Sequence, residues 1–289
     1  MTCQGRWVVL LGSCLGFGLT MGCDEPLQPG VAPTAAAGGV GAGGSGPQTP
    51  AAVARAGSES FALAWQDDFD TFDASLWALQ TFSWDGNLAQ FSTANAQVSN
   101  GVVTINLTRE PSDTAKPFRG VEMRSTRTIT YGKVEARIRF ARGSGVVSGL
   151  VTIYTPWPAD DWNEIDFEHL GRATGAVQTS CQVYTGPATE PPLTVSVTPT
   201  RFEQVVSLGF DAEADFHLYG VEWTPENVVF LVDGQVVRTW NQEIARMKLP
   251  QNILFTIWAS NAPGWAGAID DTTAPTSAEM DWIKVYDFI

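Results

Sequence analysis

Residues Lys133–Phe140 read Lys-Val-Glu-Ala-Arg-Ile-Arg-Phe, so that apolar and charged side chains alternate strictly. Successive side chains of a β-strand point to opposite faces, and this period of two predicts a strand that is buried on one face and solvated on the other. The stretch therefore predicts that the folded part of the chain is built from half-buried β-strands.

Hairpin signals lie on both sides of this strand. The alternating segment Val103–Leu107 follows Asn100-Gly101, and Asp233-Gly234 separates Val228–Val232 from Gln235–Trp240. Asn-Gly and Asp-Gly favour the tight turns that join antiparallel strands. Both segments are therefore predicted to form hairpins.

Other segments fit the same fold class. Asn252–Trp258 is an almost continuous apolar run, as expected of a strand covered on both faces. Only Asn241–Leu249 has a pattern that would suit a short helix. Many short strands separated by turn signals predict an all-β sandwich or jelly roll.

The composition excludes several function classes. The chain of 289 residues has 31 acidic and 17 basic residues, a net charge of -14, which argues against a nucleic-acid partner because phosphate contacts need a basic patch. No apolar run reaches the roughly 20 residues of a membrane span. Two histidines and four cysteines favour neither a zinc site nor a disulfide scaffold.

The chain divides into three predicted segments. Residues 1–22 are expected to be a signal peptide, because Arg6 precedes an apolar stretch. Residues 23–57 are expected to be a linker, since Gly, Ala and Pro make up 22 of the 32 residues from Pro26 to Gly57 and cannot bury enough apolar surface to fold. Residues 58–289 are expected to form one domain, exported with the mature protein.

The segment Glu164-Ile165-Asp166-Phe167-Glu168 carries the most chemical information. As a strand it sends Ile165 and Phe167 to one face and three acids to the other. Like charges so close repel and raise one another's pKa, which costs folding free energy. Catalysis gains from the same arrangement, because it separates an ionised carboxylate from a protonated acid. A solvated polar face or a calcium site would also account for three acids.

Paired carboxylates suit the cleavage of a glycosidic bond. One protonates the leaving oxygen, and the other attacks the sugar or activates water. Residues four apart on a strand have α-carbons about 13 Å apart, whereas retaining enzymes need carboxyl groups at about 5–5.5 Å and inverting enzymes at about 6.5–9.5 Å. The spacing alone does not decide the stereochemistry.

The same motif, followed by Leu170-Gly171, resembles the signature of family-16 glycoside hydrolases, and without an extra residue it is most similar to the lichenase and xyloglucan-transglycosylase branch. The resemblance extends over nearly the whole predicted domain. The other matching segments are Gly209–Ala212, Phe216–Tyr219, Trp223–Pro225, Val232–Gly234 and Ala278–Tyr286.

The resemblance implies a fold and a mechanism. The fold is a concanavalin A-like jelly-roll β-sandwich of two curved antiparallel sheets, with a cleft on the concave face. The mechanism is a retaining double displacement that requires no cofactor. Glu164 would be the nucleophile, Glu168 the general acid and then base, and Asp166 would hold the nucleophile and tune the pKa of its neighbours.

The resemblance also implies residues that bind sugars, whose apolar ring faces stack on aromatic side chains. The aromatic candidates are Trp162, Tyr184, Trp258 and Trp265, and the polar candidates are Glu122, Arg124, Gln178 and Asp85. His169 occupies a position that is usually aromatic in lichenases. We expect it either to hydrogen-bond near the acid or to be a packed, satisfied core residue.

Three further residues are singled out by their context. Leu19–Cys23 resembles a bacterial lipoprotein cleavage box, which implies a lipidated Cys23; an ordinary signal peptide is the alternative. Asp281 matches an aspartate that ligates a structural calcium ion on the convex face of relatives, where the other ligands are backbone carbonyls. Cys181 is expected to be a buried, small apolar residue.

These expectations combine into one functional prediction. The protein is expected to be a retaining, endo-acting glycosidase on a β-glucan, with mixed-linkage β-1,3-1,4-glucan as the first choice and β-1,3-glucan as the second. The alternatives are a glucan transglycosylase with the same site and a non-catalytic glucan-binding surface protein. We expect a monomer, either secreted or held in the cell envelope, that meets a membrane only through a lipid anchor.

Overall fold

The structure is a computed structural model that describes residues 61–155, 161–185 and 200–289. The expected signal peptide and linker, Cys23 among them, lie outside the described residues, and so do the side chains of Asp161, Tyr184, Thr185 and Thr200. The predicted segment boundaries therefore stay predictions.

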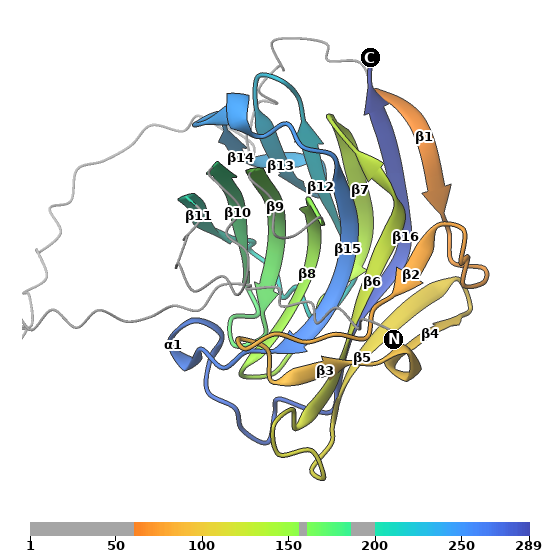
Figure 1. The fold of residues 1–289 in the computed structure, drawn as a ribbon, viewed down its shortest axis with the longest axis vertical. Helices are drawn as coiled ribbons and strands as arrows, with labels where there is room; N and C mark the ends of the chain where they lie inside the picture. The colour runs from red at the N-terminus through yellow and green to blue at the C-terminus, as the bar shows by residue number, and fades with distance from the viewer. Residues whose placement is uncertain (1–60, 156–160, 186–199) are drawn as a thin grey trace, which may run out of the picture. The chain divides into compact units, whose positions relative to one another are not determined.

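Strands make up most of the described part of the chain (Figure 1). They are β1 (Phe61–Asp67), β2 (Trp77–Leu79), β3 (Ala89–Phe91), β4 (Ala96–Ser99), β5 (Val102–Arg109), β6 (Phe118–Ile129), β7 (Gly132–Arg139), β8 (Val146–Ile153), β9 (Asp161–Leu170), β10 (Ala176–Thr185), β11 (Thr200–Ser207), β12 (His217–Trp223), β13 (Val228–Val232), β14 (Gln235–Trp240), β15 (Gln251–Ala259) and β16 (Thr276–Phe288).

Helical structure in the described residues is limited to single turns at η1 (Thr93–Asn95), η2 (Ile244–Arg246) and α1 (Pro263–Ala266). The helix predicted at Asn241–Leu249 is therefore wrong except for η2, because Glu243 directly before this turn has a left-handed backbone with φ 54°. None of these turns has the length that a helix needs to cross a bilayer.

The strands form two sheets, which are joined to each other along one edge. Sheet I has the order β11-β10-β9-β8-β15-β6, with β2 also on β6. Sheet II has the order β5-β16-β7-β12-β13-β14, with β1 on β16 and β4 on β5. Strands β5 and β6 pair with each other and join the two sheets. Every pair is antiparallel except β3 with β6, and this arrangement confirms the antiparallel jelly-roll sandwich.

The core lies between the two sheets and follows the alternation in the sequence. The apolar residues of β7, Val134, Ala136 and Ile138, are buried, and the charged residues between them are half-buried. Burial of one such large apolar side chain contributes roughly 1.5–3 kcal/mol. Every residue of β15 is buried, as the continuous apolar run predicts, and Cys181 is a fully buried free thiol, as expected.

Both predicted hairpin turns are confirmed. Asn100 and Gly101 have φ values of 54° and 75°, and Asp233 and Gly234 have 48° and 75°. Positive φ at both central residues is the backbone of a two-residue turn that matches the twist of the flanking strands. The turns set the registers of β4 with β5 and of β13 with β14.

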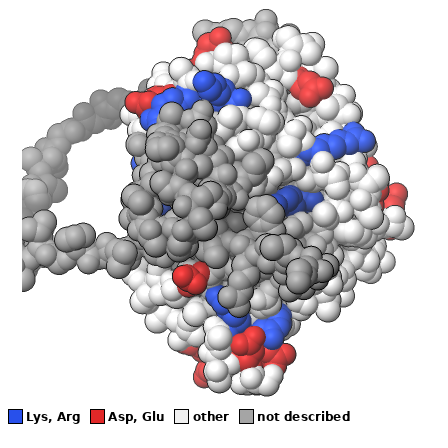
Figure 2. Space-filling view, in the orientation of Figure 1, with Lys and Arg blue, Asp and Glu red and all other residues white. Residues whose placement is uncertain are grey.

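The register of β9 decides which face carries the acids. Ile165 and Phe167 are buried in the sandwich, where the Phe167 ring lies 5.6 Å from Tyr219 and 5.2 Å from Phe230 of sheet II. Because side chains alternate along a strand, the intervening acids face the opposite side of sheet I. On the molecular face shown in Figure 2, basic side chains are spread among uncharged and acidic surface.

Candidate active site

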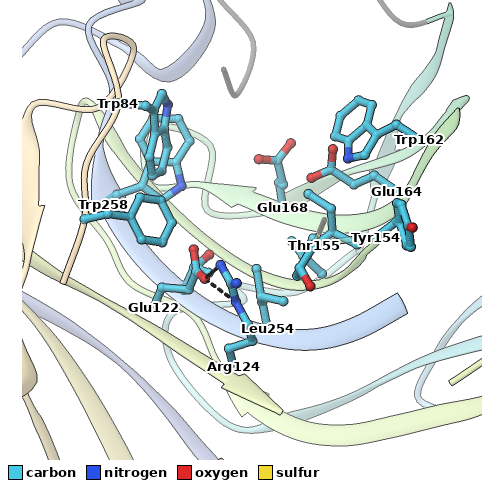
Figure 3. A pocket seen from close by; sticks show the side chains of 14 residues that line it. Trp84, Glu122, Arg124, Tyr154, Thr155, Trp162, Glu164, Glu168, Leu254 and Trp258 are labelled. Atoms are coloured by element: carbon cyan, nitrogen blue, oxygen red, sulfur yellow. Dashed lines mark hydrogen bonds and ion pairs between the residues drawn. The ribbon is translucent and has the colours of Figure 1, made fainter. Parts of the chain in front are cut away.

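A cleft lies on the face of sheet I that is turned away from the sandwich core (Figure 3). It contains about 690 Å³ of space not filled by protein atoms, part of it open to solvent. Residues from β6, β8, β9 and β15 form its floor and walls, together with residues that precede β3 and follow β8. They are Phe82, Trp84, Glu122, Arg124, Val151, Ile153, Tyr154, Thr155, Trp162, Glu164, Glu168, Leu254, Thr256 and Trp258.

The strand register places three cleft residues, together with Gly149, in one transverse row. Glu168 of β9 is opposite Gly149 of β8, which is opposite Thr256 of β15, which is opposite Glu122 of β6. A Cβ atom at Gly149 would come within 2.9 Å of the Phe167 carbonyl oxygen. Glycine therefore permits the close approach of β8 and β9 and leaves the floor beside Glu168 without a side chain.

A parallel row contains Asp166 and Arg124. Asp166 is opposite Val151, Val151 is opposite Leu254, and Leu254 is opposite Arg124. Arg124 donates from Nε to Oε1 of Glu122 at 2.8 Å, and its Nη2 pairs with the same oxygen. Burial raises the pKa of Glu122, and the Arg124 charge opposes that rise. The sequence predicts both residues for the cleft, and the structure brings them together there as an ion pair.

The three acids of β9 interact strongly with one another. Glu164 is buried, and its pKa is well above the usual value because of burial and the charges of Asp166 and Glu168. Glu168 keeps part of its side chain exposed in the cleft, and burial followed by the Asp166 charge raises its pKa well above normal. Groups coupled in this way lose their protons one after another, so the trio holds a proton and a negative charge together over a wide pH range.

Asp166 has its own hydrogen-bond partners on β10. Its Oδ2 accepts a hydrogen bond from Ser180 Oγ and another from Gln182 Nε2 at 3.0 Å. Burial raises the pKa of Asp166 to about 6, and these two donors oppose the rise. The sequence singles out neither donor, although Gln178, Ser180 and Gln182 alternate along the strand and so share one face.

The carboxyl groups of Glu164 and Asp166 share a side-chain hydrogen bond. Glu164 Oε2 and Asp166 Oδ1 are buried and have no further donor among the described residues. Buried polar atoms are normally satisfied, and exceptions concentrate where a ligand or reaction uses the atom. A cleft-lining carboxyl group that is held by a neighbouring acid alone is suited to attack an electrophilic carbon once it is ionised.

Aromatic rings lie at two ends of the cleft (Figure 3). Trp84 and Trp258 meet edge to face at 5.2 Å at one end, and Trp162 lies beside Glu164 at the other. The sequence predicts Trp258 and Trp162 and misses Trp84, whose only signal is its alternation with Phe82. The structure therefore provides aromatic surfaces on either side of the acids.

The remaining predicted cleft residues lie beside the cleft or outside it. Trp265 contacts Trp258 at 5.9 Å and donates from Nε1 to Oε1 of Gln178 at 3.0 Å, so these two residues support one end without lining it. Asp85 is exposed, does not line the cleft and uses its carbonyl oxygen to accept from Asn261. Tyr184 is opposite Trp162 in the backbone register, and its side chain lies outside the described atoms.

The metal prediction is not supported by the donor set. Oδ2 of Asp281 pairs with Nη1 of Arg137, and a guanidinium on this carboxylate competes with any cation. Within the described part of the chain, no group of three or more His, Cys, Asp or Glu residues is arranged to hold a metal ion. The calcium site, whose other expected ligands are backbone carbonyls, stays a prediction.

Comparison with known proteins extends these observations. A β-glucanase of Fibrobacter succinogenes is 33% identical over 178 residues, which are 60% of this chain and 48% of that protein. This chain therefore spans about half the length of that relative.

Two solved structures have the same fold. A β-1,3-1,4-glucanase (lichenase) from a mouse hindgut metagenome matches with a TM-score of 0.65 and 29% identity, over 78% of this chain and 99% of that one. The laminarinase catalytic domain of Thermotoga maritima matches with a TM-score of 0.65 and 25% identity, over 80% and 100%. The model of glycosyl hydrolases family 16 matches residues 81–284, which include the whole cleft, and the chain belongs to this family.

Proposed function

We propose that the protein is an endo-acting β-glucanase that cleaves its substrate with retention of configuration at the anomeric carbon. One observation carries the proposal: Glu164 and Glu168 extend from one face of β9 into a single cleft bounded by tryptophan rings, with Asp166 between them. Mixed-linkage β-1,3-1,4-glucan is the first expected substrate and β-1,3-glucan the second.

In the first step, a carboxylate oxygen of Glu164 forms a bond to the anomeric carbon while the bond to the glycosidic oxygen breaks. The leaving oxygen takes the proton of Glu168, so the released sugar carries a hydroxyl group and Glu168 becomes a carboxylate. The product of this step is a covalent glycosyl ester on Glu164.

In the second step, water attacks the same anomeric carbon. Glu168 now accepts a proton from this water, the ester bond to Glu164 breaks, and Glu164 leaves as a carboxylate. Two inversions give net retention, and both acids return to their starting protonation states. A sugar hydroxyl in place of water would give transglycosylation with the same balance.

The electrostatics of the trio suit the general-acid role of Glu168. The raised pKa of Glu168 keeps a proton available for the leaving oxygen. Repulsion among the three acids makes the loss of a second proton harder than that of the first, so one ionised and one protonated carboxyl coexist. The side-chain hydrogen bond that Glu164 shares with Asp166 orients this residue and supports Glu164 as the nucleophile.

The substrate proposal rests on the cleft and on the relatives. Trp84, Trp162 and Trp258 offer flat surfaces for the apolar faces of sugar rings. The relatives are named β-glucanase, lichenase and laminarinase, and these names support a β-glucan of mixed or β-1,3 linkage.

The test uses the Glu164→Gln variant, with an exposed acid, Glu226→Gln, as matched control. Wild type and control are expected to cleave lichenan or laminarin, and Glu164→Gln is expected to bind the same glucan without turnover. The anomeric form of the first product is followed by NMR and should be that of the substrate. Undiminished hydrolysis by Glu164→Gln, or inverted product, contradicts the mechanism.

A panel of lichenan, laminarin, xyloglucan and agarose tests the substrate. Cleavage of none of the β-glucans would overturn the substrate class. Longer products made in the presence of acceptor oligosaccharides would indicate a transglycosylase, and binding of glucan by wild type without any cleavage would indicate a binding protein.

We further propose export, lipidation of Cys23 and a monomeric state, all supported by the sequence alone. Cys23→Ser should move the protein from the membrane fraction to the soluble one, and absence of the wild type from membranes contradicts the anchor.

Size-exclusion chromatography with light scattering checks the monomer. Thermal unfolding with calcium and with a chelator checks the metal, and equal midpoints would rule out a structural calcium ion.

A further inference from the structure

The ring of His169 is buried directly behind the proposed general acid. His169 follows Glu168 on β9 and therefore points to the opposite side of sheet I, into the sandwich. It is fully buried and stacks on Phe140, with ring centroids 5.4 Å apart and an interplanar angle of 15°. Its packing resembles that of the aromatic residue expected at this position, but its two nitrogens add polar contacts.

Both ring nitrogens face atoms that only accept hydrogen bonds. Nδ1 lies 2.9 Å from the carbonyl oxygen of Ala176, and Nε2 lies 3.0 Å from Oε1 of Glu213. A neutral imidazole has one N–H and one lone pair, so it can satisfy only one of these two acceptors. The pair must hold an additional proton, either on Nε2 of His169 or on the carboxyl group of Glu213.

Arg142 decides between these two positions. Its Nε lies 3.3 Å from Oε2 of Glu213, the oxygen that His169 does not contact. A guanidinium beside this oxygen favours the ionised carboxylate. Asp211, the other charged group facing this cluster, lies 3.9 Å from Arg142 and accepts from the backbone N–H of Glu213. The geometry therefore puts the additional proton on His169.

These contacts join three segments next to the cleft. Ala176 is the first residue of β10, and His169 is the penultimate residue of β9. The chain around Glu213 is held to the turn between these strands, because Ala212 N–H donates to the Thr174 carbonyl at 2.8 Å. The ring thus fixes the ends of β9 and β10, on which Glu168 and Gln178 are opposite each other.

We propose that His169 is a buried imidazolium and a positioning residue, whose two hydrogen bonds to Ala176 and Glu213 hold the end of β9 so that Glu168 is aligned with the leaving oxygen. The inference rests on the proposed role of Glu168 as general acid. His169 takes no part in the proton transfer; it acts through the backbone that it shares with Glu168.

The protonation state can be tested directly by NMR. The chain has two histidines, so labelling with ¹⁵N-histidine gives only two rings to assign. His217 is half-exposed and pairs with Asp233, and it serves as the internal reference. At neutral pH both nitrogens of His169 should be protonated, each with a slowly exchanging proton. One unprotonated nitrogen in the His169 ring at neutral pH overturns the proposal.

The positioning role can be tested by leaving-group dependence. A glucan oligosaccharide with a dinitrophenyl leaving group needs no proton from the acid, whereas the polysaccharide does. His169→Phe keeps the stack on Phe140 and loses both hydrogen bonds, so kcat on the polysaccharide should fall about tenfold or more, with little change in KM. The kcat/KM on the dinitrophenyl substrate, which reports the first step alone, should fall much less.

Two other variants make the result decisive. His217→Phe should behave as wild type on both substrates. Glu213→Gln can donate to a neutral His169 and keep both contacts, so it should lose less polysaccharide activity than His169→Phe, and its His169 ring should show one unprotonated nitrogen. If His169→Phe does not fold, the NMR measurement and the Glu213→Gln variant still test the assignment.

Glu168→Gln separates this inference from the proposed function. If Glu168→Gln loses kcat/KM on the polysaccharide and keeps kcat/KM on the dinitrophenyl substrate, which reports the first step alone, the general-acid role holds. Equal losses on both substrates in His169→Phe would then overturn the positioning role alone. Equal losses of kcat/KM on both substrates in Glu168→Gln would instead overturn the proposed function.

Discussion

Gln182 Nε2 donates a 3.0 Å hydrogen bond to Oδ2 of Asp166 from the neighbouring strand. Ser180 Oγ donates to the same oxygen. These donors support the ionised form of Asp166, whose pKa burial raises to about 6, whereas the pKa values of Glu164 and Glu168 are well above normal. The middle carboxyl is therefore the acid of the trio with the best hydrogen-bond support for a negative charge.

The charge of Asp166 should cost stability at neutral pH. A pKa raised from 3.8 to about 6 corresponds to about 3 kcal/mol. Because the folded form binds this proton more tightly, the free energy of unfolding is highest below the unfolded pKa and falls as the pH rises through about 6. Asp166→Asn should therefore raise the thermal midpoint at pH 7, with a difference that vanishes near pH 4, and should lower activity. Calorimetry at both pH values checks this, and a lower midpoint at pH 7 contradicts it.

Removal of a donor to Asp166 should change the pH profile of catalysis. In Ser180→Ala the ionised form of Asp166 loses a hydrogen bond of the charge-assisted kind. Its pKa should rise further, and the acidic limb of kcat/KM should move to higher pH by about one unit. Ser207→Ala, at an exposed position of β11, is the control. If the acidic limb of kcat/KM does not shift in Ser180→Ala, the ionisation of Asp166 does not govern activity.

The Glu122–Arg124 pair should behave as a buried ion pair. Arg124→Met leaves the buried Glu122 without its cation, and the loss of stability should be about 3 kcal/mol at pH 7. The Glu122 pKa then rises, so the loss is present above this pKa and disappears at low pH, where Glu122 is neutral. The double variant Glu122→Gln/Arg124→Met should recover most of the stability. Denaturant unfolding of Arg124→Met, of Glu122→Gln and of the double variant provides the measurement, and additive losses would exclude the coupling.

The aromatic end of the cleft should contribute to binding more than to chemistry. Trp258 packs on Trp84 and Trp265, so Phe at this position keeps an aromatic surface while reducing its area. Trp258→Phe should raise KM several-fold with a small change in kcat, because the lost contact is equal in ground and transition states. Trp282→Phe, on sheet II, is the matched control. A loss confined to kcat would place Trp258 closer to the reaction than proposed.

Much of the fold is predictable from local patterns. The alternation in β7, the Asn100-Gly101 and Asp233-Gly234 turns and the buried β15 depend on neighbours in sequence, and all are found. The predicted helix fails because a left-handed residue, Glu243, restricts the segment to a single turn, and no local pattern marks that conformation.

The candidate site is only partly predictable. The acids of β9 share a face by alternation alone, so the sequence places them together. Ser180 and Gln182 become partners of Asp166 only through the register of β9 with β10, which is set by the packing of the whole sheet. Asp85 lies outside the cleft lining, because Trp84 enters the cleft and its neighbour faces solvent.

Cys181 has a practical consequence for work with this domain. It is the one cysteine in the described part of the chain, it is fully buried, and burial raises the pKa of its thiol well above normal. The thiolate is the reactive form, so this sulfur resists air, thiol reagents and exchange with disulfides. The described domain can therefore fold in a reducing cytosol without an oxidant or isomerase, and its preparation and assay are independent of the redox potential of the buffer.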